Sequence, residues 1–160
     1  MESSVKVLFV CMGNICRSPT AQGVFHKLLQ REGLDRIIEI DSAGTHAYHV
    51  GEPPDQRSRE TAVRRGIDLG NLRARRVESE DFSYYDYVLA MDQDNLANLF
   101  VLCPPESEHK LTLFMDFAPH LGIQEVPDPY YGGASGFERV FDMVEAASEG
   151  LLDDIRRRFL

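Results

Sequence analysis

A chain of 160 residues, of which 43% are hydrophobic and 27% charged, has the size and composition of a single globular domain spanning residues 1–160. The net charge of −9 argues against nucleic-acid binding, which needs a basic face. Three cysteines do not make a disulfide framework, so we expect a reducing compartment, the cytoplasm. The opening apolar run is too short for a membrane span or signal peptide, and no membrane partner is expected.

Short apolar runs rich in branched and aromatic residues predict four buried strands, at residues 5–10, 37–40, 87–91 and 111–115. Helical patterns lie between and after them. The first helix is predicted to have Ser18 as its N-cap and to close at Gly33. A second covers residues 55–65 and ends at Gly66, and a third follows Asp92.

The last helix is predicted to start at a capping box formed by Ser135 and Glu138. Alternation of strands and helices predicts an α/β fold, a doubly wound, flavodoxin-like parallel sheet with helices on both faces. In such sheets ligands bind beyond the carboxyl ends of the strands, near the point where the strand order reverses. Cys11, which follows the first predicted strand, lies at such a strand end.

One strand end carries the strongest signal. Cys11 follows the first strand, five loop residues come next, and Arg17 and Ser18 open the first helix. A loop that turns from a strand into a helix points backbone N–H groups inward, and this arrangement binds anions such as phosphate. The predicted phosphate-binding residues are Met12, Gly13, Asn14, Ile15, Cys16, Arg17 and Ser18.

These residue types suit nucleophilic attack on a phosphoryl group. The loop N–H groups and the helix terminus favour the thiolate form of Cys11, the predicted nucleophile. Arg17 can hold two phosphate oxygens bidentately, which a lysine cannot. Ser18 can donate a hydrogen bond to the sulfur. Gly13 and Asn14 tolerate the positive φ that so tight a loop demands.

Cleavage of a phosphate ester also needs a general acid, since an alkoxide or phenolate leaves poorly. Asp128 is the predicted acid, because it lies in a long loop after the fourth strand, at the same edge of the sheet as Cys11. Pro127 and Pro129 restrict the backbone on either side of it. On its own, such an Asp-Pro pair is more typical of a turn.

Together these motifs resemble the low-molecular-weight protein tyrosine phosphatases. The resemblance rests on the segment from Cys11 to Pro19 and on Asp128 to Tyr131, and it spans essentially the whole chain. It implies that Cys11 forms a cysteinyl-phosphate, that Arg17 stabilises the transition state, and that Asp128 protonates the leaving oxygen and then helps to activate water. It implies no metal and no cofactor. The implied partners are phosphotyrosine-containing proteins and a tyrosine kinase.

The resemblance also implies supporting roles. Asn14 would hold the shape of the loop, together with Ser18 and Ser42. Cys16 would form a reversible disulfide with Cys11 under oxidation, although from sequence alone it equally suits a small buried hydrophobe. Many relatives carry a histidine that supports the loop asparagine, and here Leu72 occupies that place. Either Asn71 substitutes for it or the support is rebuilt.

Specificity is expected from an aromatic wall that takes a flat phenyl ring. The predicted wall residues are Met12, Tyr48, Tyr130 and Tyr131. The competing interpretation is that the tyrosines only cover the core. His26, His46 and His49 show no metal-ligand spacing, and surface roles are expected for them.

Other functions fit the sequence less well. Related arsenate reductases need two further cysteines, and only Cys103 remains. Related phosphoarginine phosphatases commonly have threonine where this chain has Ile15. A non-catalytic module that binds phosphate or FMN would not need Cys11, Arg17 and Asp128 together. A nucleotide P-loop is excluded because its Gly-Lys-Ser/Thr ending is missing.

Overall fold

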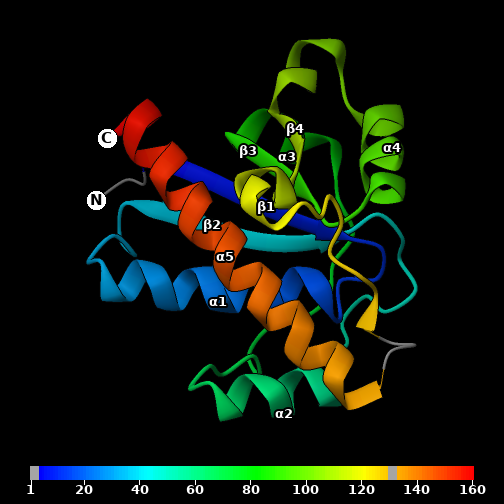
Figure 1. Cartoon of the computed structure of the whole chain (residues 1–160). Helices are drawn as coiled ribbons and strands as arrows, with labels where there is room; N and C mark the ends of the chain where they lie inside the picture. Colours follow the sequence, from blue (N-terminus) through cyan, green and yellow to red (C-terminus); the bar gives the residue numbers. More distant parts are fainter. Residues whose placement is uncertain (1–3, 130–132) are drawn as a thin grey trace.

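The computed structural model describes residues 4–129 and 133–160. Within these residues the chain forms a four-stranded parallel sheet in the order β2-β1-β3-β4 (Figure 1). The strands are β1 (Val5–Cys11), β2 (Ile38–Gly44), β3 (Tyr87–Ala90) and β4 (Leu111–Leu113). All four predicted strands are confirmed. β2 runs further than predicted, because it stays paired with β1 to the end of that strand.

The strand order explains why one edge of the sheet can bind a ligand. β1 pairs with β2 on one side and with β3 on the other, so that Phe9 lies beside both Ser42 and Leu89. The chain leaves β1 toward β2 and later returns past β1 to build β3. The order therefore reverses between β1 and β3, and a crevice opens beyond their carboxyl ends. Cys11 is the last residue of β1, and Asp92 follows β3 closely.

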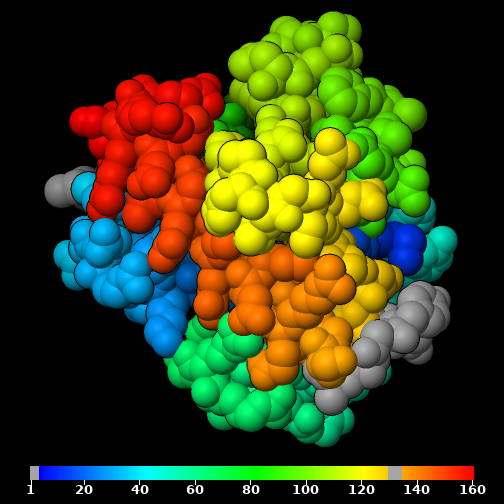
Figure 2. Space-filling model, viewed as in Figure 1, coloured from blue at the N-terminus to red at the C-terminus, as the bar shows by residue number. Residues whose placement is uncertain are grey.

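Helices cover both faces of the sheet, as predicted (Figure 1). On one face, α1 (Arg17–Arg31) and α5 (Gly133–Phe159) pack together, and α2 (Gln56–Arg64) packs against α5. On the other face lie α3 (Ser79–Tyr84) and α4 (Gln93–Leu102). The length of α5 lies across the molecular face in Figure 2. The described residues accordingly form two apolar cores, one on each side of the sheet.

Short 3-10 helices lie between α4 and the loop that carries Asp128: η1 (Pro105–Lys110), η2 (Phe114–Phe117) and η3 (Pro119–Leu121). Neither these nor α3 was predicted. α3 is only six residues long, too short for an apolar period to show, and a capping box between Glu78 and Asp81 stabilises it. No helix in the described parts of the chain is long and apolar enough to cross a membrane.

Two predicted helix starts are wrong. The N-cap of α1 is Cys16, and Ser18 lies inside the first turn, where its hydroxyl contacts the sulfur of Cys11 instead of a backbone amide. α5 begins at Gly133, so Ser135 is already helical and cannot cap it. The other predicted boundaries hold: Asp55 and Asp92 cap α2 and α4 through their side chains.

Candidate active site

The loop predicted to bind phosphate connects β1 to α1 and is folded around the sulfur atom of Cys11. Cys11 is 3% exposed. Its Sγ accepts a hydrogen bond from the backbone N–H of Asn14 at 3.3 Å, and the Ser18 Oγ lies 3.0 Å away. Hydrogen bonds of this kind to sulfur would stabilise negative charge on it.

Asn14 holds the curl of this loop. Among the described residues it is the only non-glycine with positive φ, at 59°. Its side-chain amide donates to the Ser18 Oγ at 2.8 Å and to the Ser42 Oγ at 3.0 Å. The Ser42 hydroxyl donates in turn to the Gln22 Oε1 at 2.7 Å. The predicted support residues Asn14, Ser18 and Ser42 are therefore brought together in one buried hydrogen-bond network.

The support that a histidine gives in relatives is rebuilt here from backbone. The Asn14 Oδ1 accepts from the backbone N–H of Arg75 at 3.0 Å. Arg75 is fixed by ion pairs with Asp41 and Asp81, each at 3.0 Å. Burial lowers the pKa of Arg75, but hydrogen bonding to Asp81 and the charge of Asp41 more than offset this and raise it. A permanently charged, doubly anchored Arg75 thus positions the amide that holds Asn14.

Arg17 is buried, with 5% of its surface exposed. Its Nη1 donates to the Asp92 Oδ2 at 2.7 Å and to the backbone oxygen of Val126 at 3.0 Å. Burial opposes its charge, but the nearby Cys11 sulfur and Asp92 raise its pKa overall. Sequence reasoning missed Asp92 as a partner of Arg17. The available signal was its place just after β3, across the strand-order reversal from Cys11.

A hollow of about 290 Å³ lies over the loop. It is lined by Cys11, Met12, Gly13, Ile15, Cys16, Arg17, His49 and Asp128. Asp128 thus reaches the same cleft as Cys11, although the two are far apart in sequence. The volume is at the small end of the range typical for ligand pockets.

The predicted aromatic wall is only partly placed. Met12 lines the cleft and is 44% exposed. Tyr48 is 72% exposed and stacks on His46 with ring centroids 5.2 Å apart, while the neighbouring His49 lines the hollow. His49 is held by a 2.6 Å contact with Glu52 and was not predicted as a site residue. Tyr130 and Tyr131 lie outside the described residues.

Cys16 also faces the cleft, and it is 8% exposed. Burial raises the pKa of its thiol to about 12, helped by the negative charges of Asp55 and Cys11. Cys16 is therefore protonated at neutral pH. Among the described residues no cluster of His, Cys, Asp and Glu side chains could hold a metal ion.

Comparison with known proteins shows the family to which the chain belongs. The family model for low molecular weight phosphotyrosine protein phosphatases matches residues 6–159. The chain belongs to this family. It is a protein-tyrosine-phosphatase of the low-molecular-weight type, as the resemblance implied.

The similarity to relatives and solved structures extends over nearly the whole of each chain. A phosphatase of this type from Schizosaccharomyces pombe is 42% identical over 97% of this chain and 99% of its own. The crystal structure of a protein tyrosine phosphatase from Entamoeba histolytica is 44% identical, with a TM-score of 0.93 over 96% of this chain and 98% of its own. A Drosophila arginine phosphatase is 29% identical, with a TM-score of 0.89 over 95% and 98% of the two chains.

The contact between Arg17 and Asp92 leads to a prediction for this phosphatase. Asp92→Asn should lower kcat/KM for an aryl phosphate about 10²-fold, because Arg17 loses the charge that aims its guanidinium. Asparagine still accepts a hydrogen bond from the Asn95 N–H, so α4 keeps its cap. Steady-state kinetics checks this, with Asp94→Asn in the same helical turn as the matched control. Equal losses in both variants would contradict the positioning role.

Proposed function

We propose that the phosphatase hydrolyses phosphotyrosine through a cysteinyl-phosphate on Cys11. The observation that carries this mechanism is the shared cleft, where Asp128 faces a buried sulfur that already accepts hydrogen bonding from its own loop. In the first step the Cys11 sulfur forms a bond to phosphorus as the P–O bond to the tyrosine breaks. Asp128 gives its proton to the departing oxygen.

The second step reverses these roles. The Asp128 carboxylate accepts a proton from water, the water oxygen bonds to phosphorus, and the S–P bond breaks to return the thiolate and inorganic phosphate. The Ser18 hydroxyl, 3.0 Å from the sulfur, stabilises the thiolate as it leaves. Asp128 therefore ends the cycle protonated, ready for the next substrate.

Residues 12–18 would bind the phosphoryl oxygens through backbone N–H groups, and Arg17 would add a bidentate contact. Asp92 and Val126 occupy Nη1 of Arg17, which leaves the N–H groups of Nε and Nη2 for phosphate. Fixed donors of this kind stabilise the charge that develops on the equatorial oxygens and need no reorganisation during the reaction. The loop network around Asn14 supplies this rigidity.

The substrate proposed is phosphotyrosine on proteins, with a tyrosine kinase as the source of that modification. Met12 at the rim, and the predicted wall of Tyr48, Tyr130 and Tyr131, would take the phenyl ring. Phosphoarginine is the second candidate, because one structural neighbour is an arginine phosphatase. Ile15 favours phosphotyrosine, since the related phosphoarginine enzymes commonly carry threonine there.

One comparison tests this assignment. Peptides that carry phosphotyrosine, phosphoserine or phosphoarginine at the same position are incubated with one preparation of the phosphatase, and phosphate release is measured. We expect kcat/KM to be highest for phosphotyrosine. Release confined to the phosphoarginine peptide would contradict the proposal, and Ile15→Thr would then show whether this position sets the preference.

The pair Cys11 and Cys16 is proposed to protect the enzyme from irreversible oxidation. Peroxide would convert the Cys11 thiolate to a sulfenic acid. The Cys16 thiolate would then attack the sulfenic sulfur to form the disulfide, displacing hydroxide, which takes up a proton from solvent to give water. Because only a thiolate attacks, and the pKa of Cys16 is raised to about 12, closure is slow at neutral pH and accelerates as pH rises.

The resulting prediction is that recovery of activity by a thiol reductant, after a fixed peroxide pulse, is greater at pH 9 than at pH 7. In the range below this pKa the thiolate fraction of Cys16 grows about tenfold per pH unit. Cys16→Ser should recover poorly at both pH values, whereas Cys103→Ser should behave like the native enzyme. Full recovery of activity in Cys16→Ser would show that Cys16 does not protect Cys11.

We further infer that residues 1–160 act as one phosphatase domain in the cytoplasm, without a metal or cofactor. The charge of −9 supports the absence of a nucleic-acid partner. Three cysteines, which are free in this structure, suit a reducing compartment.

A further inference from the structure

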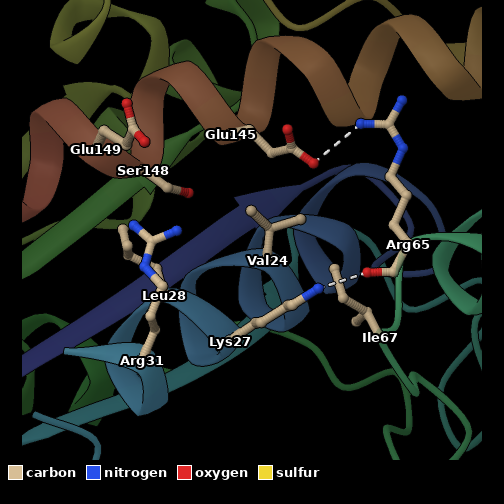
Figure 3. Close-up of a pocket in the computed structure, with 9 residues that line it drawn as sticks. All are labelled: Val24, Lys27, Leu28, Arg31, Arg65, Ile67, Glu145, Ser148 and Glu149. Atoms are coloured by element: carbon tan, nitrogen blue, oxygen red, sulfur yellow. Dashed lines mark hydrogen bonds and ion pairs between the residues drawn. The ribbon is translucent and has the colours of Figure 1, made fainter. Parts of the chain in front are cut away.

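A second cavity of about 340 Å³ lies between α1, α5 and the segment that follows α2 (Figure 3). It is lined by Val24, Lys27, Leu28, Arg31, Arg65, Ile67, Glu145, Ser148 and Glu149. It shares no lining residue with the catalytic cleft. Its α1 residues begin seven positions after Arg17, about 10 Å along the helix. This cavity is therefore separate from the phosphate loop.

The inner surface of the cavity is apolar. Val24, Leu28 and Ile67 are 6%, 8% and 7% exposed, and Val24 points up from α1 toward α5 in Figure 3. Together they offer a hydrophobic surface of the kind that ligand pockets use to bury the body of a small molecule. The cavity volume is within the range of such pockets.

Ser148 places an unsatisfied hydroxyl against this surface. The residue is 1% exposed, and its Oγ has no hydrogen-bond partner within the described parts of the chain. Figure 3 shows the side chain leaving α5 toward the space above α1. A buried hydroxyl without a partner costs about 1–3 kcal/mol. A ligand that hydrogen-bonds to Ser148 would remove this cost.

The charges at the mouth of the cavity favour an anion. Lys27 donates one of its N–H groups to the backbone oxygen of Arg65 at 2.6 Å, which leaves two donors. Arg31 makes a 3.8 Å ion pair with Glu32, too long for a hydrogen bond, so its guanidinium keeps donors for a ligand.

Most of the other charged residues around the cavity are engaged in ion pairs. Glu145 pairs with Arg65 at 3.0 Å, and Arg65 is shared with Asp142 and Glu138 on the same helix. Figure 3 shows Glu149 on α5 across the gap from Arg31 on α1, so its carboxylate would repel an anion bound at Arg31. Glu32, the partner of Arg31, is itself held by Arg156 at 3.0 Å, so Glu149 is the carboxylate that most directly opposes Lys27 and Arg31 at the mouth.

We propose that this cavity binds a small organic carboxylate with an apolar or aromatic body. The body lies on Val24, Leu28 and Ile67. The carboxylate is held by Arg31 and Lys27, and the Ser148 hydroxyl donates to it. Because α1 begins at Arg17 and α5 follows the loop of Asp128, such a ligand contacts both helices that adjoin the catalytic segments.

The test uses 3-phenylpropionate as the probe and 3-phenylpropanamide as its neutral counterpart. Backbone amide shifts of the ¹⁵N-labelled phosphatase are followed by NMR, with the catalytic cleft saturated by inorganic phosphate. We expect saturable shifts at residues 24–31, 65–67 and 145–149 with the carboxylate. The amide should bind about tenfold more weakly, the effect of losing one charge-assisted contact.

Variants assign the contacts. Arg31→Gln should weaken the carboxylate about tenfold and Ser148→Ala more modestly, while Glu149→Gln should tighten it. Arg36→Gln, at an exposed arginine outside the cavity, is the matched control and should change nothing. Any one of four results would overturn the proposal. These are equal binding of acid and amide, unchanged binding in Arg31→Gln, shifts confined to residues 11–18, and no saturable shift up to about 10 mM.

Discussion

Cys11→Ser should lower kcat for an aryl phosphate by at least about 10⁴-fold, because the serine hydroxyl is far less ionised and less nucleophilic than the thiol it replaces. The variant should still bind an oxyanion. Although the Asn14 N–H and the Ser18 hydroxyl contact the sulfur, the loop has other anchors, since the Asn14 side chain is held through Ser18, Ser42 and the Arg75 amide. Phosphate or vanadate affinity should change by no more than about threefold.

Two measurements separate these effects. Single-turnover kinetics reports the chemical step, and isothermal titration with vanadate reports the binding site. Cys103→Ser, at a buried cysteine far from the cleft in sequence, is the matched control and should keep full activity. If Cys11→Ser kept even a few per cent of native turnover, another group would have to be the nucleophile.

Asp128→Asn should slow cleavage of phenyl phosphate about 10²–10⁴-fold, because the amide cannot protonate the departing oxygen. For 4-nitrophenyl phosphate the first step should change little, since this leaving group departs without a proton. The dependence of the rate on leaving-group pKa should therefore become much steeper in the variant. That slope distinguishes an acid from a residue that only shapes the cleft.

The matched control for this prediction is Asp116→Asn, at an exposed aspartate in η2. It should leave rates and slope unchanged. Equal losses for both substrates in Asp128→Asn would contradict the proton-donor role. They would point instead to a general effect on binding or on the loop.

Much of the fold could be predicted because β1 sits at the centre of the sheet. A strand buried on both faces must be apolar at nearly every position. In residues 5–10 every residue except Lys6 is apolar. The starts of α2 and α4 were predictable for an equally local reason, because the side chains of Asp55 and Asp92 cap the N-termini of these two helices. Features that depend on neighbouring residues, such as a buried strand or a helix cap, can be predicted from a single sequence.

The misplaced caps show where local rules fail. Ser18 has the residue type and place of an N-cap, but its hydroxyl serves the sulfur of Cys11. Ser135 and Glu138 match a capping box, yet α5 has already begun at Gly133. At α1 the Ser18 hydroxyl is engaged by a tertiary contact with sulfur, which a capping rule does not consider.

The partners of the catalytic groups were the least predictable part of the site. Asp92 meets Arg17 because β3 lies beside β1, and this neighbour relation is a property of the strand order. The amide of Arg75 supports Asn14 from 61 positions away, and a backbone donor leaves no mark on residue identity. The absent histidine at Leu72 therefore signalled only that support had changed, and not what had replaced it.

The central claim is that the phosphoryl group passes through Cys11. It is tested most directly by mixing Asp128→Asn with 4-nitrophenyl phosphate, quenching in denaturant within the first turnover, and mapping peptides by mass spectrometry. The variant forms the intermediate quickly and hydrolyses it slowly, so the intermediate should accumulate. We predict one phosphoryl group on the peptide that contains Cys11. A phosphoryl group on any other residue, or none during turnover, would contradict the account.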